Sequence, residues 1–462
     1  MCRIGDLPVE ILGLIFLQVH SRTLSSSTTK FTTSDVVVTL SLVSSLWRET
    51  CISISSLWSH IHIVKTSSNE VERLQMFLER SGSCPLTIEF HAGADAVPYT
   101  ADAGRMIWKL FGASARWKKA LFSVQAPFLE VIAMVLSGES GSLQLAQRFE
   151  FPLLEKLSFT RHLDNQSRHF VNIFQPKVTP RLHILVIPSY TALLPFAFGQ
   201  ITSLNLFKTN KALPDLSVLC PQLVTLKIGQ TFGDPNEATP PHAFELLKVE
   251  TLTVSCSGPG RLWSMLTLPS LRNLTLEAIT FMRLEYVAFI NMLRRSGCGQ
   301  SLRKLTLSGM DMRDVEVQSM FDLMPQLREL VVRETLTRQG KTLTASLLTA
   351  LKSTSRDLAI IYPFAPSINH LIPDLAYIEL HIDYNPNFRL DILFDMLSAR
   401  AIISNDSSSA LRWIHLCFIL DQNSPPSRVP LELEGMVNKL RLVSTSHIHS
   451  TVQCGQEWRR EF

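Results

Sequence analysis

Two histidine pairs are the residues of this sequence whose types and spacing come closest to a reactive site. The run HIH occurs at 60–62 and again at 447–449, and alternate residues of a strand lie on one face. Cys454 follows the second pair and would add a possible metal ligand. Because a zinc site needs four well-placed ligands, or three and a water, we assign no metal ligand. We expect His60 and His62 to border a strand.

Sites for a nucleophile or a phosphate are not supported by the sequence either. SGESGS at 137–142 approaches the nucleophile elbow G-x-S-x-G, but Ser142 stands where the second glycine belongs. GPGR at 258–261 lacks the Lys-Ser/Thr pair of a phosphate-binding loop. The tryptophans are spread along the chain, so no stacking platform for single-stranded nucleic acid is indicated. We predict no catalytic residue and no cofactor, and we expect that the protein is not an enzyme.

The composition is that of a globular protein. Of 462 residues, 46% are hydrophobic and 18% are charged, so the chain can bury a large core. The net charge of +4 is too small to favour nucleic acid or an anionic membrane as a partner, and the apolar run at 128–136 is too short for a membrane span. Eight cysteines without a CxxC pair indicate buried thiols in a reducing compartment, and the first residues lack a signal-peptide core. We expect a cytoplasmic or nuclear protein.

The N-terminal segment predicts an amphipathic helix. Pro8 suits the first turn of a helix, and Glu10 suits the positive end of its dipole. Apolar residues follow at three- and four-residue steps, which places them on one face. They are Ile11, Leu12, Ile15, Phe16 and Val19. The Ser/Thr-rich stretch at 21–34 has no hydrophobic period, and we expect it to be a loop.

A second short helix is predicted after this loop. Ser34 or Asp35 can cap it. Its apolar face would carry Val36, Leu40, Val43 and Trp47. Two helices of this size cannot cover all their apolar surface by packing on each other, which implies a partner surface.

The segments LPVEILGLIF and LSLVSSLW together resemble the F-box. That pattern is L-P-x-E-[IL]-[IL]-x-x-[IV]-[FL], then a gap, then L-x-x-V-[CS]-x-x-W. The matching residues are Leu7, Pro8, Glu10, Ile11, Ile15, Phe16, Val43, Ser44 and Trp47. SISSLWSHIHI, which follows, resembles the segment after the F-box in fungal members of the family. The chain departs from the pattern in its long loop at 21–34, and in Ser45 and Leu46, where the family usually carries basic residues.

A short unit of the form L-x-x-L-x-L recurs along the rest of the chain. It occurs at 153–159, 181–187, 201–206, 223–228, 249–254, 271–276, 302–307, 327–332, 375–380 and 411–416, with degenerate members at 84–90 and 119–124. In each unit a polar residue alternates with the last two apolar ones, which predicts a short strand with one buried side. Helical periods at 284–297 and 314–324 predict helices that pack behind the strands. This pattern is typical of leucine-rich repeats. A conventional α/β domain with leucine-rich strands is the alternative.

We therefore predict an α/β protein in which a small all-α F-box is followed by an irregular leucine-rich-repeat solenoid. The predicted domains are an F-box-like helical domain at 1–58, with its loop at 21–34, the solenoid at 59–455 and a C-terminal tail at 456–462. The two widest gaps between units, after 327 and after 375, predict a distorted solenoid.

The F-box resemblance implies the substrate-recognition subunit of a Skp-cullin-F-box ubiquitin ligase, a protein that performs no chemistry itself. Its partners would be the Skp adaptor, through it a cullin, and an unknown target protein. Residues carried over as adaptor-binding are Leu7, Pro8, Ile11, Ile15, Phe16, Val43 and Trp47, some of which can instead belong to the domain's own core. Candidate target-binding residues are the polar strand residues Lys156, Asn205, Lys227, Thr253, Asn273, Lys304 and Glu329. The alternatives are a leucine-rich-repeat scaffold outside any ligase and, third, a hydrolase, for which no nucleophile and base can be paired.

Overall fold

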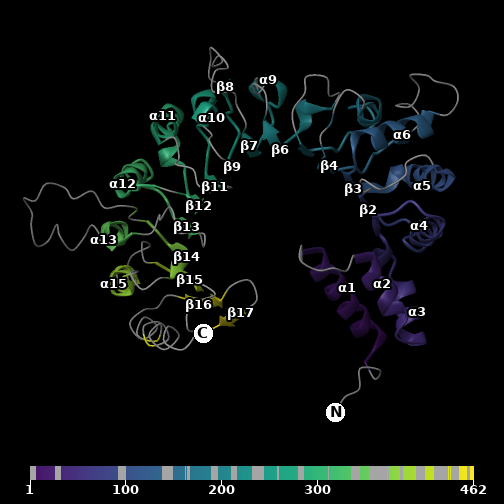
Figure 1. The fold of residues 1–462 in the computed structure, drawn as a ribbon, viewed down its shortest axis with the longest axis horizontal. Helices are drawn as coiled ribbons and strands as arrows, with labels where there is room; N and C mark the ends of the chain where they lie inside the picture. The colour runs from purple at the N-terminus through teal and green to yellow at the C-terminus, as the bar shows by residue number, and fades with distance from the viewer. Residues whose placement is uncertain are drawn as a thin grey trace, which may run out of the picture. The chain divides into compact units, whose positions relative to one another are not determined.

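A computed structural model shows an α/β protein in which parallel strands alternate with helices (Figure 1). It describes residues 7–25, 33–91, 100–137, 149–161, 163, 167–188, 196–209, 216–231, 244–256, 260–278, 286–310, 312–334, 344–352, 372, 374–384, 389–401, 411–420, 435, 438, 447–454 and 458–461. The chain divides into two compact units, Met1–Phe207 and Lys208–Phe462. The boundary between them falls inside the segment predicted as one solenoid.

Among the described residues, three helices and a 3-10 turn precede the first strand of unit 1, in the segment predicted to be helical. They are α1 (Val9–Ser25), α2 (Thr33–Ser41), α3 (Ser45–Ser53) and η2 (Ser55–Trp58). Helix α1 contacts both α2 and α3. The prediction of a loop at 21–34 was wrong at both ends, because α1 continues to Ser25 and α2 begins at Thr33. Residues 21–25 contain no glycine or proline that would end a helix, whereas 26–32 lie outside the described residues.

The second predicted helix was also wrong in its extent, because the structure divides it into α2 and α3. Residues 42–43 form a turn, and Ser44 has an extended backbone with φ −158° and ψ 168°. Its side chain accepts a hydrogen bond from the Trp47 backbone N–H at 3.2 Å, which caps the new helix. Val43 therefore lies in the turn and does not continue the apolar face of Val36 and Leu40.

Parallel strands of unit 1 lie side by side in chain order. They are β1 (His60–Ile63), β2 (Leu86–His91), β3 (Trp117–Ser123), β4 (Lys156–Phe159), β5 (Ile184–Ile187) and β6 (Ser203–Thr209). The helices between them are α4 (Ser68–Arg80), α5 (Ala101–Gly112), α6 (Ala126–Ser137) and α8 (Arg168–Val171), with 3-10 turns η3 (Ser114–Arg116), η5 (Asn172–Phe174) and η6 (Phe198–Gln200). These helices lie on one side of the strands, as expected for helices that pack behind a repeat sheet (Figure 1).

Helix α5 illustrates how the connecting helices form. Thr100 has an extended backbone, and its hydroxyl accepts a hydrogen bond from the Ala103 N–H at 3.1 Å. The residues that α5 buries recur at helical spacing; they are Ala103, Met106, Ile107, Leu110 and Phe111. A capped start and one buried stripe are sufficient to dock the helix on the sheet.

The core of unit 1 is made by alternate strand residues. Leu157, Leu185 and Leu204 are paired in register across β4, β5 and β6, and all three are buried. Beside them Phe122 and Phe159 stack with centroids 5.6 Å apart and ring planes 19° apart. The L-x-L pattern thus places its apolar members on the helix side of the sheet and its polar members on the other side.

Unit 2 repeats this arrangement. Its parallel strands are β7 (Thr225–Thr231), β9 (Thr251–Cys256), β11 (Asn273–Ala278), β12 (Lys304–Ser308), β13 (Glu329–Arg333), β14 (Tyr377–Tyr384), β15 (Trp413–Leu420) and β16 (His447–Cys454). Its helices are α9 (Leu216–Leu219), α10 (Gly260–Met265), α11 (Tyr286–Ser296), α12 (Asp314–Asp322), α13 (Ala345–Lys352) and α15 (Leu390–Ala401), with the 3-10 turn η7 (Cys298–Gln300). A separate parallel pair joins β8 (Phe244–Glu245) to β10 (Leu266–Thr267).

The strand predictions from the repeat are confirmed. Each of the ten L-x-x-L-x-L units contains a strand, and the two degenerate units form β2 and β3. The helices predicted at 284–297 and 314–324 are α11 and α12. The predicted tail at 456–462 differs, because Trp458–Glu461 forms β17 and pairs antiparallel with β16.

Candidate partner-binding surfaces

Helix α1 carries far more apolar surface than its own domain covers. Leu12, Phe16 and His20, four residues apart, are buried on one side of it. The large apolar side chains exposed on its other sides are Val9, Ile11, Leu14, Ile15, Leu17 and Val19. A helix that is apolar all round is normally buried, so this one lacks a cover within its own domain.

The turn between α2 and α3 adds to this exposed apolar surface. Leu42 is 70% exposed and Val43 is 58% exposed, and with Leu14 at 62% they are the most exposed large apolar residues of the N-terminal helices. Ile52 of α3 is exposed as well. We call these residues and the exposed ones of α1 the N-terminal apolar surface. Single exposed apolar residues are normal on soluble proteins, but a concentration of this kind marks an interaction site.

The predicted adaptor-binding residues divide between this surface and the core. Pro8, Ile11, Ile15 and Val43 are exposed, and Leu7 and Trp47 are half-buried. Phe16 is fully buried within the domain and so belongs to its core, the alternative that the sequence left open for some of these residues.

Sequence reasoning missed Leu14 and Leu17 of α1. The search for one apolar stripe selects residues at three- and four-residue steps, and in α1 part of that stripe is the domain's core. The sequence did contain a signal for the exposed side, namely the apolar residues that lie outside this stripe. A helix that packs by one face alone would have polar residues at those positions.

The predicted target-binding residues all lie on the polar side of the strands and are half-buried. In unit 2, Asn273, Lys304 and Glu329 are paired in register across β11, β12 and β13. The Lys304 ammonium lies 2.8 Å from a Glu329 carboxylate oxygen. These three residues therefore form one row.

The other four predicted target-binding residues do not join that row. Lys227 of β7 and Thr253 of β9 are paired with each other. Each stands between the two buried apolar residues of its own strand. Lys156 and Asn205 belong to unit 1, where they pair with Ile184 and Val186 respectively and so occupy different rows.

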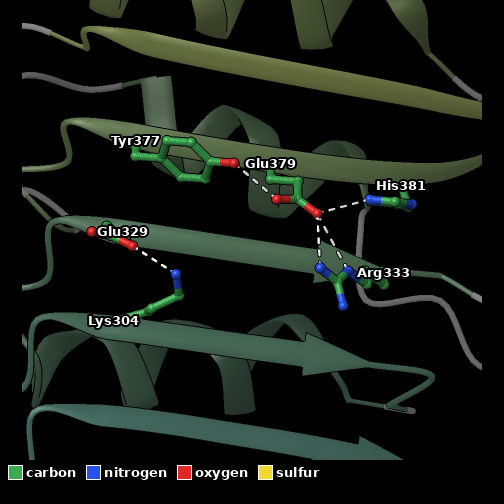
Figure 2. A network of polar contacts seen from close by, with 6 residues as sticks. All are labelled: Lys304, Glu329, Arg333, Tyr377, Glu379 and His381. Atoms are coloured by element: carbon green, nitrogen blue, oxygen red, sulfur yellow. Dashed lines mark hydrogen bonds and ion pairs between the residues drawn. The ribbon is translucent and has the colours of Figure 1, made fainter. Parts of the chain in front are cut away.

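A network on β13 and β14 extends the polar surface of unit 2 (Figure 2). Glu379 is its centre: one carboxylate oxygen accepts hydrogen bonds from Arg333, the shorter at 3.0 Å, and contacts His381 Nε2 at 2.9 Å. The other oxygen accepts the Tyr377 hydroxyl at 2.9 Å. Sequence reasoning missed these residues, because parallel pairing of strands far apart in the chain brings Arg333 and Glu379 together.

The network keeps Glu379 ionised and Tyr377 neutral near neutral pH. Burial by itself would raise the pKa of Glu379, but the hydrogen bonds from Arg333, Tyr377 and His381 lower it to about 2. Burial and the hydrogen bond to Glu379 raise the pKa of Tyr377 to about 12. The hydrogen bond with Cys417 raises the pKa of His381. Burial lowers this pKa, and the hydrogen bond with Glu379 raises it further, so that the overall shift is upward. This surface presents an oriented pattern of charge that suits recognition of a polar protein surface.

A second polar cluster lies on the first two strands of unit 1. His62 of β1 is paired in register with Glu89 of β2, and His91 stands two residues further along β2 on the same face. His60 Nε2 lies 3.5 Å from one Glu89 carboxylate oxygen, and His91 Nε2 lies 3.8 Å from the other. The His62 and His91 ring centroids are 4.9 Å apart. We call His60, His62, Glu89 and His91 the histidine cluster.

Contacts within the histidine cluster and with α1 shift its pKa values. The contacts that Glu89 makes with His60 and His91 lower the pKa of its carboxyl group well below the usual range. Burial, and then the neighbouring His91, lower the pKa of His62. Burial, and then His60, lower the pKa of His20 in α1 to about 4. His20 and His60 have ring centroids 6.3 Å apart, so α1 reaches the first strand.

The remaining sequence motifs acquire no site in the described residues. Residues 138–142 of SGESGS lie outside them, and the last two residues of GPGR begin α10. His447, His449 and Cys454 belong to β16, whose side chains also lie outside the described residues.

Comparison with known proteins does not identify a family: no protein-family model matches the sequence, and no curated protein matches it. Within the described part of the chain no helix is both long and apolar enough to cross a membrane.

Proposed function

We propose that this protein is the substrate receptor of a Skp-cullin-F-box ubiquitin ligase, with its N-terminal helices bound to the Skp adaptor. The observation that carries the proposal is the N-terminal apolar surface. It lies on the helices that resemble the F-box, and it includes the predicted contact residues Ile11, Ile15 and Val43. An apolar helix laid against a groove of a partner is a common mode of recognition.

Covering this surface would contribute favourable free energy to a complex. Burying one Leu, Ile or Val side chain stabilises by about 1.5–3 kcal/mol. Leu14 and Leu42 expose more than half of their surface, so they are the anchors from which we expect the largest contribution. The half-buried Trp47 packs against the buried Phe16 and so ties α3 to α1, the helix that carries most of this surface.

In this proposal the strand face of unit 2 binds the target protein. The row of Asn273, Lys304 and Glu329 and the network around Glu379 offer charges of both signs in fixed positions. The protein performs no chemistry: holding a target near the ligase raises the effective concentration of its lysines at the ubiquitin-charged enzyme.

Co-expression with the Skp adaptor of the same organism, followed by size-exclusion chromatography, tests the adaptor contact. The variant is Leu14→Asp with Leu42→Asp. A matched control is Val287→Asp, because Val287 on α11 is 70% exposed, as is Leu42. We expect the wild type and the control to co-elute with the adaptor, and the double variant to bind at least tenfold more weakly.

Circular dichroism establishes that the double variant retains its helices. A soluble, folded wild type that does not bind the adaptor contradicts the proposal. It would leave the repeat scaffold outside a ligase as the interpretation.

A further inference from the structure

We propose that His62, Glu89 and His91 form a binding site for a zinc-class divalent cation at the start of the strand face of unit 1. One candidate ligand atom from each residue lies within 4.8 Å of the other two. The sequence offered only the pair at 60 and 62, and the parallel pairing of β1 with β2 adds the carboxylate and the further imidazole.

The backbone of two adjacent strands positions these three side chains. His62 and Glu89 are direct partners in the parallel register, so their side chains leave neighbouring strands at the same height. Glu89 and His91 are two residues apart on β2, whose burial alternates, so both point away from the buried side of the sheet. Three ligands on two paired strands form a rigid support, which is what a specific metal site needs.

The ligand types fit zinc better than magnesium or calcium. Two imidazoles and one carboxylate are a known set for zinc with an open fourth position, whereas magnesium and calcium prefer oxygen ligands alone. Zinc at its usual ligand distances separates tetrahedral ligand atoms by about 3.3 Å. The present separations of up to 4.8 Å exceed this by about 1.5 Å, so the three half-buried side chains would have to turn towards one another to hold the ion.

His60 completes the site as a positioning residue. It is buried, and its Nε2 lies 3.5 Å from Glu89 Oε1, the oxygen opposite to the one that faces His91. An imidazole that holds the far oxygen of a ligating carboxylate orients that ligand. The positive charge of Arg73 lowers the pKa of His62. The Arg73 guanidinium also forms an ion pair with Glu70, with Nη1 3.3 Å from Oε1, which offsets its charge.

Metal titration of the full chain tests the site, with Co²⁺ as the spectroscopic probe and Zn²⁺ as the competitor. We expect one Co²⁺ to bind with visible absorption, and Zn²⁺ to displace it. His62→Ala and His91→Ala should each lower the affinity at least tenfold. His169→Ala is the matched control, because His169 is an exposed histidine on α8, outside the histidine cluster, and it should leave the affinity unchanged.

Thermal unfolding supplies a second measurement. Zn²⁺ should raise the melting temperature of the wild type and of His169→Ala, but not that of His62→Ala, because a metal held by two strands stabilises the folded state. His60→Gln should weaken binding less than loss of a ligand does. Co²⁺ binding that is the same in the wild type, His62→Ala and His91→Ala would overturn the proposal, and so would the absence of binding by the folded wild type.

Discussion

The Phe16 and Trp47 rings pack against each other with centroids 4.9 Å apart and planes tilted by 58°, and this contact joins α1 to α3. It separates two roles within one sequence motif. Phe16 is fully buried and holds the helices together, whereas its neighbour Ile15 is 38% exposed and is available to a partner. The two residues can therefore be tested for different properties.

Replacing Phe16 with alanine is expected to destabilise the N-terminal helices by about 3–5 kcal/mol, the usual cost of removing a buried phenylalanine. Ile15→Ala should change their stability by less than about 1 kcal/mol, because the side chain is already in part exposed. Hydrogen exchange of peptides from 9–53, followed by mass spectrometry, measures both effects. Equal protection of the two variants would contradict the assignment of Phe16 to the core.

Ser44→Ala is expected to destabilise α3 by about 1 kcal/mol, because it removes the oxygen that accepts the Trp47 N–H. Ser44→Asp keeps an acceptor at the same place and should retain most of the stability. Urea unfolding of both variants provides the comparison. If alanine and aspartate behave alike, the hydroxyl does not act as a cap.

Glu379→Gln is expected to lower the stability at neutral pH by about 2 kcal/mol, because it removes a charged acceptor from Arg333, Tyr377 and His381. The folded pKa of Glu379 is about 2, below the ordinary value of 4.5. Its stabilising contribution is therefore present above pH 4.5 and is lost as the pH falls towards 2. Urea unfolding from pH 7 to pH 3 should show the difference between wild type and variant shrinking below pH 4.5; a constant difference would contradict the network.

Loss of Glu379 should also change the titration of His381. The hydrogen bond with Glu379 is one of the two contacts that raise the pKa of this histidine, so Glu379→Gln should lower it. Proton NMR of the histidine rings measures the shift, with His381→Gln used to assign the signal. An unchanged His381 pKa would mean that the contact with Cys417 alone sets it.

Arg400→Met is expected to destabilise unit 2 by about 2–4 kcal/mol. Arg400 of α15 is 4% exposed and donates hydrogen bonds to the carbonyls of Leu351 and Ile372. Methionine keeps most of the volume but leaves both carbonyls without this donor. Thermal unfolding compares it with Arg389→Met, a control at an exposed arginine just before the same helix, which should change little.

The strands of this protein could be predicted because one local pattern encodes them. In L-x-L the leucines at 305 and 307 are buried and Lys304 is on the other side, and the two apolar residues of every unit are buried in the same way. In β4, β12 and β13 the residue between them is buried as well. The extent of the N-terminal helices could not be predicted as well. Val36, Leu40, Val43 and Trp47 fit one helix by spacing, and the competing hydrogen bond of the Ser44 side chain ends it.

The polar clusters could not be predicted, because their members come from different strands. Arg333 and Glu379 are far apart in the chain, and His62 and Glu89 are separated by a whole helix. Periodicity fixes which side of a strand each residue occupies, but only the order and register of the strands bring them within contact distance. The exposed apolar side of α1 was missed for a related reason. A helical period shows that apolar residues share a face, but it does not show which face is buried in the domain's own core.

Strand β17 gives the sheet of unit 2 a reversed final strand, because Thr451 to Cys454 of β16 pair with it antiparallel. An uncovered parallel strand offers its backbone N–H and C=O groups to any other chain that can add a strand. The change of direction occupies part of that edge with a segment of the same chain. The strand that stands at this end of the sheet is therefore only four residues long, and a short edge strand leaves little backbone with which a second chain could pair.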